Sequence, residues 1–369
     1  SSIEAGFEAA FWDNRLCLDF TYYKTDSRNQ ILKLATTAAS GYTSQVRNAG
    51  HIRNRGYEIQ LGAVPIQTSK GFRWNLDLNY GANSSKVVKL DDEGLITSYR
   101  LYSSGIQILA SVGEAYGTLF GTSYVRDANG NVVVDANGLP KISTTNKTLG
   151  KFTPDWTGGI SNTFSYRSLS LSFLIDASVG GSIFSNTNKT GKYTGVLANT
   201  LSGRDAEHGG LWYYTAAMGN NVRLPESPSY SVSSDGLYYA QVNGQSTRVY
   251  QDGIMVEGVT ESGSKNEEVV SAEKYYQRIY SIAEANVYDA SYVKLREVAL
   301  SYRLPRLWTQ KLHLQEASVT LTGRNLWTIY KSVPNIDPES ALTTGNAQGV
   351  EAYSLPTTRS FGVNLSVKF

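Results

Sequence analysis

The three histidines are the first residues to consider for metal or acid–base chemistry, and their spacing argues against both roles. His51, His208 and His313 lie far apart in the chain, and none belongs to an H-x-x-x-H pattern, which would place two imidazoles on one helix face. We therefore expect structural or solvated roles for all three. Asp205 and Glu207 lie beside His208 and could contribute to a cation site, but polar clusters of this length are common in surface loops.

Residues 127–138 have the sequence DANGNVVVDANG, which at first sight has the acidic spacing of a calcium loop. The twelfth position of such a loop requires a glutamate, and here that position is Gly138. Two Asn-Gly steps on either side of three valines instead predict a hairpin. Cys17 is the only cysteine, so no internal disulfide or cysteine cluster is possible. We predict no catalytic, cofactor-binding or metal-binding residue in this chain.

Aromatic residues are frequent in the segment 184–289, which includes the run Trp212-Tyr213-Tyr214. Aromatic faces stack on sugar rings and tyrosine hydroxyls bond polar ligands, so Trp212 and Tyr213 are predicted to be substrate contacts. An open alternative is that these rings pack the loop or contact a partner protein. The net charge of +2 gives no indication of nucleic-acid binding.

The elements that would position these loops are strands with two different faces. At the end of the chain, Phe361, Val363, Leu365, Val367 and Phe369 alternate with polar or small residues and therefore share one strand face. The same alternation predicts eight further strands near residues 3–11, 15–24, 53–65, 71–86, 154–166, 169–183, 290–304 and 316–330. In the last two of these strands, the apolar residues change from one face to the other partway along. A β-bulge, or a stretch of the strand above the bilayer, would explain this change.

The connections between the predicted strands alternate in length, with short turns near 13–14, 66–70, 167–168 and 305–315 and long loops over 25–52, 87–153, 184–289 and 331–356. Outer-membrane barrels have short periplasmic turns and long external loops. No run of about 18 apolar residues predicts a membrane-spanning helix, whereas a barrel strand needs only about 9–11 alternating residues. The sequence therefore predicts an all-β fold, an antiparallel transmembrane β-barrel with long extracellular loops. A soluble β-sandwich lectin and an adhesin or enzyme barrel are the alternatives.

The number of predicted strands bears on domain organisation. Nine is odd, whereas closure of an antiparallel bacterial barrel needs an even number. Two open sheet edges in lipid would leave backbone groups without hydrogen bonds. Ser1 also falls directly before a strand pattern. We therefore expect residues 1–369 to be the C-terminal part of a longer barrel, with the partner strands supplied by the same protein.

Several separated motifs give the chain a family resemblance. Residues 289–305 (DASYVKLREVALSYRLP), 321–327 (LTGRNLW) and 334–339 (PNIDPE) look like late-strand signatures of SusC/RagA-type TonB-dependent transporters. Residues 4–8, 22–23, 29–32 and 48–58 resemble the middle barrel of the same family. The resemblance spans nearly the whole chain, and its motifs occur in order.

The resemblance implies a fold and a function beyond what the residues show. It implies a 22-stranded barrel in a Bacteroidetes-type outer membrane, with a plug domain and a TonB box that are not in this chain. It also implies import of a nutrient oligomer, in the first place a glycan and alternatively a peptide, without any enzymatic activity.

The resemblance implies partners as well. A SusD-like surface lipoprotein would act as a lid, the TonB–ExbB–ExbD complex would supply energy through the missing N-terminal part, and transporter–lid pairs could form dimers. The terminal residues Val363, Leu365, Val367 and Phe369 resemble the β-signal that the barrel assembly machinery recognises before insertion into the lipid bilayer.

Overall fold

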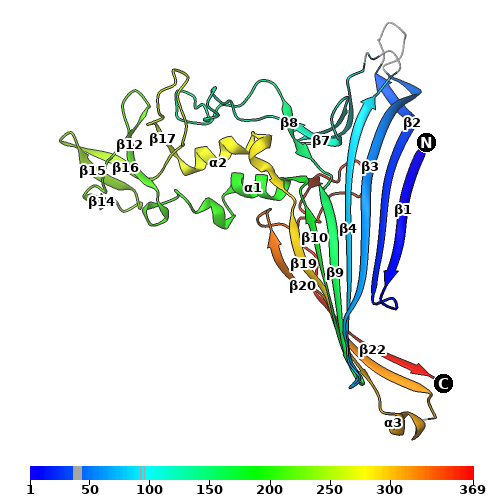
Figure 1. The fold of residues 1–369 in the computed structure, drawn as a ribbon. Helices are drawn as coiled ribbons and strands as arrows, with labels where there is room; N and C mark the ends of the chain where they lie inside the picture. The colour runs from blue at the N-terminus through cyan, green and yellow to red at the C-terminus, as the bar shows by residue number, and fades with distance from the viewer. Residues whose placement is uncertain (36–43, 92–93, 95, 312) are drawn as a thin grey trace.

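The computed structural model describes residues 1–35, 44–91, 94, 96–311 and 313–369. Nine strands form one antiparallel sheet in the order β1-β2-β3-β4-β9-β10-β19-β20-β22 (Figure 1). The strands are β1 (Ser2–Phe11), β2 (Leu16–Ala35), β3 (Ser44–Gln67), β4 (Phe72–Lys89), β9 (Trp156–Tyr166), β10 (Leu169–Val179), β19 (Tyr292–Arg303), β20 (Glu316–Lys331) and β22 (Ser360–Lys368). All nine predicted strands are confirmed.

Two of these strands are longer than the sequence predicts. The predicted loop over residues 25–52 is largely wrong, because the β2–β3 ladder continues from Thr25 paired with Asn54 as far as Ala35 paired with Ser44. The reason is physical. Beyond Tyr22 the outward residues become charged, beginning with Lys24, so the apolar contrast that reveals a strand disappears while the backbone pairing continues.

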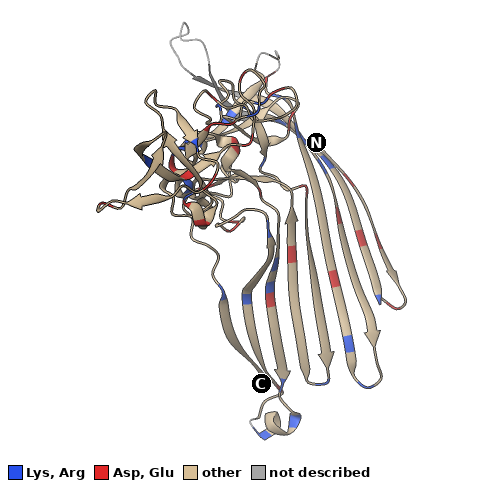
Figure 2. Cartoon of the chain, turned by 90° about the vertical axis from the view of Figure 1, so that its left-hand side faces the viewer, with Lys and Arg blue, Asp and Glu red and all other residues tan. Residues whose placement is uncertain are grey.

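The sheet has one apolar and one polar face, and the apolar face is uncovered. Among its side chains, Phe7 is 55% exposed, Leu321 51% and Val363 74%. No second layer lies over this face in the described part of the chain (Figure 2, where most of the strand length is uncharged). A soluble sandwich would bury these side chains, so the arrangement is that of a barrel wall with lipid outside.

Aromatic rings mark the two limits of the apolar face. Near the loop end, Tyr57 stacks on Tyr80 at 5.9 Å between ring centroids, and Tyr80 lies 5.4 Å from Trp156. Near the opposite end, Trp74 stacks on Phe164 at 5.6 Å. Amphipathic rings favour the boundary between hydrocarbon and water, so these two rows define the height of the lipid-facing belt.

Both predicted bulges are present. In β19, Glu297 pairs with Leu174 while Leu295 pairs with Ile175, so Arg296 is an extra residue in that strand. In β20 the register shifts between Trp327, which pairs with Leu295, and Arg324, which pairs with Glu297. Asn325 lies within this shift and has a φ of 51°. Because a bulge adds one residue to the strand, the apolar residues before and after it point to the same face of the sheet.

The short connections lie at one end of the sheet and the long ones at the other. Two residues, Arg167 and Ser168, join β9 to β10, and the connection between β19 and β20 contains α3 (Arg306–Lys311). At the other end the loop between β4 and β9 contains β5 (Ser98–Ser103), β6 (Gln107–Ser111), β7 (Tyr116–Gly121) and β8 (Lys147–Lys151). Long and short connections therefore segregate as in an outer-membrane barrel.

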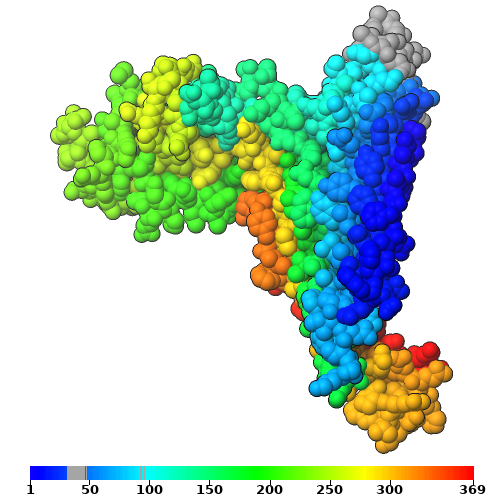
Figure 3. Space-filling model, viewed as in Figure 1, coloured from blue at the N-terminus to red at the C-terminus, as the bar shows by residue number. Residues whose placement is uncertain are grey.

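The loop between β10 and β19 is the longest and has most of the remaining structure. It contains β11 (Ser182–Ser185), α1 (Asn186–Thr194), β12 (Leu211–Thr215), β13 (Asn221–Arg223), β14 (Tyr230–Val232), β15 (Tyr238–Val242), β16 (Gln245–Met255), β17 (Val269–Ser271), α2 (Ala272–Tyr280), β18 (Val287–Asp289) and three 3-10 turns at Ala198–Thr200, Ala206–His208 and Ala283–Asn286. The loop between β20 and β22 contributes β21 (Val350–Glu351). Together these segments project from one end of the sheet as a continuous arm (Figure 3).

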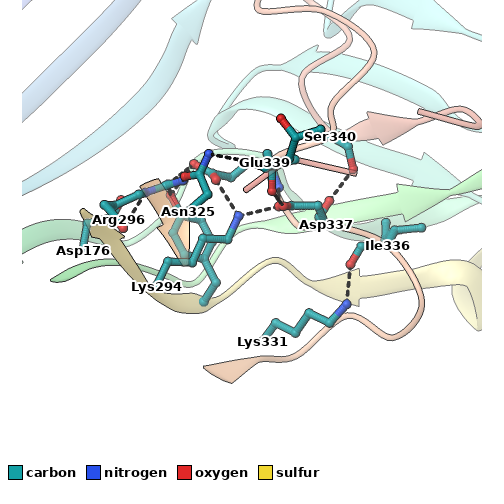
Figure 4. A network of polar contacts seen from close by, with 12 residues as sticks. Asp176, Lys294, Arg296, Asn325, Lys331, Ile336, Asp337, Glu339 and Ser340 are labelled. Carbon is teal, nitrogen blue, oxygen red and sulfur yellow. Dashed lines mark hydrogen bonds and ion pairs between the residues drawn. The ribbon is translucent and has the colours of Figure 1, made fainter. Parts of the chain in front are cut away.

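An ion network on the polar face attaches the last loop to the strands (Figure 4). Lys294 Nζ lies 2.6 Å from Asp337 Oδ1 and 2.6 Å from Glu339 Oε2. The bulge directs Arg296 to Asp176, at 2.7 Å between Nε and Oδ1, and Arg296 also pairs with Glu339. These charges compensate one another within the network, as buried or half-buried charges require.

Burial and hydrogen bonding act in opposite directions on the Asp337 carboxyl. Burial disfavours its charged form, but hydrogen bonds from Lys294 and Thr357 outweigh burial and hold its pKa below the usual value. The carboxylate is therefore ionised at neutral pH and fixes residues 332–359 to β19.

Charge on the apolar face should be far more costly than charge on the polar face. We expect Leu171→Arg to destabilise the intact protein in phospholipid vesicles by about 2–4 kcal/mol, because the side chain would enter hydrocarbon. Ser172→Arg, one residue on and facing the other way, is the matched control and should cost much less. Urea unfolding in vesicles measures both, and equal losses would contradict the assignment of the two faces.

Removal of Asp337 should loosen one loop selectively. In Asp337→Ala the buried Lys294 ammonium loses a carboxylate and the Thr357 hydroxyl loses its acceptor, at a cost of about 3–5 kcal/mol. We expect amide hydrogen exchange over residues 332–359 to accelerate at least ten-fold. Arg303→Gln is the control and should leave this exchange unchanged, because the Arg303–Glu316 pair is exposed and lies at the other end of the sheet. Unchanged protection in Asp337→Ala would show that the network does not hold the loop.

Candidate functional site

The three long loops share one hydrophobic core. Ile108 and Leu119 come from the loop after β4, Phe184 and Ala283 from the loop after β10, and Val350 from the loop after β20, and all five are buried in one cluster. Strand β11 also pairs with β21 in parallel, joining Phe184 to Val350. The loops therefore form a packed body at the long-loop end of the strands, and we refer to it as the loop body.

Charged contacts between loops fix this packing. Arg278 of α2 donates to Asp135 Oδ2 at 3.0 Å, and Arg126 Nη2 donates to Glu284 Oε1 at 3.0 Å. The fully buried Glu351 carboxylate accepts from the hydroxyls of Ser185 at 2.7 Å and of Thr187 at 2.6 Å, beside the N-terminus of α1. A helix N-terminus favours a carboxylate, so Glu351 links the last loop to the longest one.

The predicted contacts Trp212 and Tyr213 lie in the distal sheet of the loop body. Trp212 is 7% exposed, packs with Ala240 and Val249, and stacks on Tyr230 at 5.1 Å. The Tyr213 hydroxyl donates to Asp252 Oδ1 at 3.2 Å, and burial with the nearby Asp252 raises the pKa of Tyr213. Both rings pack the sheet, and their direct contact with a substrate stays a prediction.

The ring of this aromatic cluster that faces solvent is Tyr230, which is 48% exposed. It also lies 5.2 Å from the Tyr238 ring in an edge-to-face arrangement. A ligand approaching the distal sheet would therefore meet Tyr230 before it met Trp212.

A cavity of about 750 Å³ lies between α1, α2 and β16. Tyr275, Tyr276 and Tyr124 contribute to its wall, as does the buried Lys192. The Lys192 ammonium donates to the carbonyl of Ala285 at 2.8 Å, and burial lowers its pKa to about 8. The volume and the mixture of rings with a few polar groups suit a small polar ligand.

The polar face of the sheet forms a second candidate surface. The cross-strand register pairs Asp19 with Gln60, and Gln60 with Asn79. Asn79 pairs with Gly159, which in turn pairs with Asp176, so all five residues lie at the same height on the sheet. A concavity of about 420 Å³ is lined here by residues that include Asp19, Gln60 and Asn79. The register therefore places these side chains on one face of the sheet.

The weaker sequence candidates have structural roles. Asp205 accepts from the backbone N–H of His208 at 2.9 Å and caps the 3-10 turn, and its carboxylate also lies 2.7 Å from the His208 ring. Within the described ranges, no group of three or more His, Cys, Asp or Glu side chains could hold a metal ion. In the same part of the chain, no helix is long and apolar enough to cross a bilayer.

The predicted hairpin over 127–138 is present in modified form. Asp127 and Asp135 each accept backbone N–H groups from the residues that follow, at 2.8–3.1 Å, and each closes its own tight turn. The segment therefore makes two successive reversals, with isolated bridges from Arg126 to Val132 and from Val134 to Pro140.

Sequence reasoning did not find the cavity or the ion network as sites. The cavity combines Tyr124, Lys192 and Tyr275, which lie far apart in sequence and carry no shared pattern. Lys294 and Asp337 do lie in two of the family-like motifs, but only the bulge of β19 and the fold of the last loop bring these motifs together.

Comparison with known proteins agrees with this geometry. The family described as "TonB dependent receptor-like, beta-barrel" matches residues 1–194. TonB-dependent receptor P3 of Formosa agariphila is 26% identical over all of this chain and 34% of its own length, and TonB-dependent receptor P26 of the same organism is 24% identical over the same shares. The chain thus spans about one third of the length of these curated relatives.

Solved structures show the same fold. The RagAB peptide transporter has a TM-score of 0.62 at 19% identity, and the match covers 100% of this chain and 35% of the transporter chain. The RagAB peptide importer in the "open-open" state has a TM-score of 0.63 at 18% identity, and the match covers 100% of this chain and 34% of the importer chain. Barrels of this family are integral outer-membrane proteins, and they are receptors and transporters rather than enzymes. Because the family match covers more than half of its residues, the chain belongs to the TonB dependent receptor-like, beta-barrel family.

Proposed function

We propose that this chain forms part of a TonB-dependent importer that moves a nutrient oligomer across the outer membrane. The observation that carries the proposal is the nine-strand sheet with an uncovered apolar face, topped at one end by the loop body. Such a wall separates lipid from an inner polar surface, and the loops present cavities and rings where cargo would arrive. No acid–base pair is required, because the cargo is moved without being altered.

The remaining parts of the machine are proposals as well. Further barrel strands, a plug and a TonB box would come from sequence beyond these 369 residues, which is supported by the one-third share of the relatives that this chain covers. TonB–ExbB–ExbD would then supply energy. A SusD-like lipoprotein would close over the loop body, and two such pairs could associate as a dimer.

For the cargo, we propose a glycan oligomer. The cavity walls carry Tyr124, Tyr275 and Tyr276, and the distal sheet presents Tyr230, so ring faces and hydroxyls are available for sugars. A peptide is the second candidate, and it is favoured by the likeness to the RagAB peptide transporter.

Calorimetry of the intact transporter–lid complex separates these two cargo classes. We expect binding heat with glycan oligomers and none with a peptide panel. Tyr230→Ala should weaken glycan affinity by roughly ten-fold, the value of one aromatic stacking contact. Trp308→Ala, in the exposed α3 turn at the other end of the sheet, is the matched control and should leave affinity unchanged.

Heat with peptides alone would transfer the proposal to the second candidate. Absence of heat with both panels would contradict import of either cargo by this protein.

The terminal strand generates a prediction about assembly. Val363, Leu365 and Val367 of β22 share the lipid-facing side with the following Phe369, which is 82% exposed. We propose that these four residues form the signal that the barrel assembly machinery recognises. Deletion of Phe369 should lower the outer-membrane level of the protein several-fold at equal synthesis, as measured by quantitative blotting of membrane fractions. Lys368→Gln is the control, and unchanged levels in the Phe369 deletion would contradict the signal.

A further inference from the structure

Above the lipid-facing belt, the outward face of β2, β3 and β4 changes from apolar to basic. Lys24 pairs with Arg55 directly beyond the pair Tyr22–Tyr57. One step further, Arg53 pairs with Asp26 on one side and with Lys86 on the other. Because side chains alternate along a strand, all of these residues point the same way as the lipid-facing rings below them.

Among the residues that the structure describes, cations outnumber carboxylates on this face. The cations include Lys24, Arg28, Arg53, Arg55, Lys86 and the nearby Lys151, and the carboxylates include Asp26 and Asp155. Asp26 is engaged by Arg53 at 2.9 Å and by His51 at 2.5 Å, and Asp155 is engaged by Lys151 at 2.7 Å.

Four of these cations are therefore available to an external anion. Within the part of the chain that the structure describes, Lys24, Arg28, Arg55 and Lys86 have no carboxylate within ion-pair distance. Arg28, Arg55 and Lys86 are exposed, so their charged ends can meet a ligand from outside the molecule.

A groove of about 450 Å³ lies at the same height. Its walls include the Tyr22 and Tyr57 side chains at the top of the belt together with Arg55 and Lys151. Rings below and cations above match the two parts of a lipid headgroup, a sugar or glycerol body and an anion.

The opposite side of these strands is already occupied, so the basic side is the open one. Val87 of β4 points the other way from Lys86 and is fully buried with Leu90 and Ala110 of the first long loop. The loop body thus covers β4 on the inward side at this height, whereas Arg28, Arg55 and Lys86 on the outward side are exposed.

We propose that the outward residues Lys24, Arg28, Arg53, Arg55, Lys86 and Lys151, which we name the basic rim, bind the phosphate groups of an anionic glycolipid in the outer leaflet. The rim lies where headgroups begin, immediately beyond the row formed by Tyr57, Tyr80 and Trp156. Arginine and lysine form charge-assisted hydrogen bonds with phosphate, and a basic cluster at a membrane surface gains attraction with each cation. The inference rests on the two-faced sheet and not on the identity of the cargo.

The test uses the intact protein in detergent, with diphosphorylated lipid A as the probe and a binding titration at low and high salt. In the triple variant Lys24→Gln/Arg55→Gln/Lys86→Gln, affinity should fall roughly 100-fold, since each surface cation contributes about five-fold. Lys70→Gln/Arg306→Gln/Lys311→Gln removes the same charge at the short-turn end and should retain wild-type affinity. Added salt should weaken wild-type binding.

Two further arms identify the source of the anion. In the first arm, dephosphorylated lipid A should bind the wild type weakly, with the affinity that the triple variant has for diphosphorylated lipid A. In the second arm, inorganic phosphate at equal concentration should not displace diphosphorylated lipid A from the wild type. Equal affinity of the wild type and the triple variant, or equal loss in the control variant, would overturn the proposal. Full displacement by inorganic phosphate would also overturn it, because the site would then be one for free anions.

Discussion

Backbone hydrogen bonding in a medium without water is the constraint on which the rest of this structure depends. A strand that contacts hydrocarbon must satisfy every N–H and C=O through its neighbours, because lipid offers no partner. Every strand between β1 and β22 in the nine-strand sheet is paired on both sides, and the period of two then assigns one face to lipid and one to a polar interior. The exposed Phe7, Leu321 and Val363 side chains are stable there only if hydrocarbon covers them.

The same constraint explains where polar chemistry is found. Along the belt the outward face offers almost no polar group, and charges begin where the aromatic rows end, with Lys24 and Arg55. On the inward side, the Lys294–Asp337 pair is buried and joins segments that are 43 residues apart. Such buried pairs attach the loop body, which has its own hydrophobic core, to the strands.

Much of the wall could be predicted from sequence, because lipid on one side imposes strict alternation. The strands from Phe72 and from Leu169 follow from the alternation alone. The slips of the apolar phase left a bulge or a stretch above the bilayer open, and the structure has bulges near Arg296 and Asn325. The outer halves of β2 and β3 could not be predicted, because their outward residues are charged from Lys24 on and the apolar contrast is lost. The loop body could not be predicted either, because its core joins three distant segments. The sequence identifies Trp212 as an aromatic candidate, but not its packing against Ala240 and Val249 of the same loop.

Site-directed spin labelling of β22 in lipid vesicles tests the two-solvent arrangement most directly. Nitroxides placed one at a time from Ser360 to Lys368 of the intact protein would be measured for collision with dissolved oxygen, which concentrates in hydrocarbon, and with a water-soluble nickel complex. Oxygen accessibility should peak at Phe361, Val363, Leu365 and Val367 and fall at each residue between them. A protected Phe361–Val367 face that neither reagent reaches would reveal a second protein layer and would contradict a lipid-facing wall.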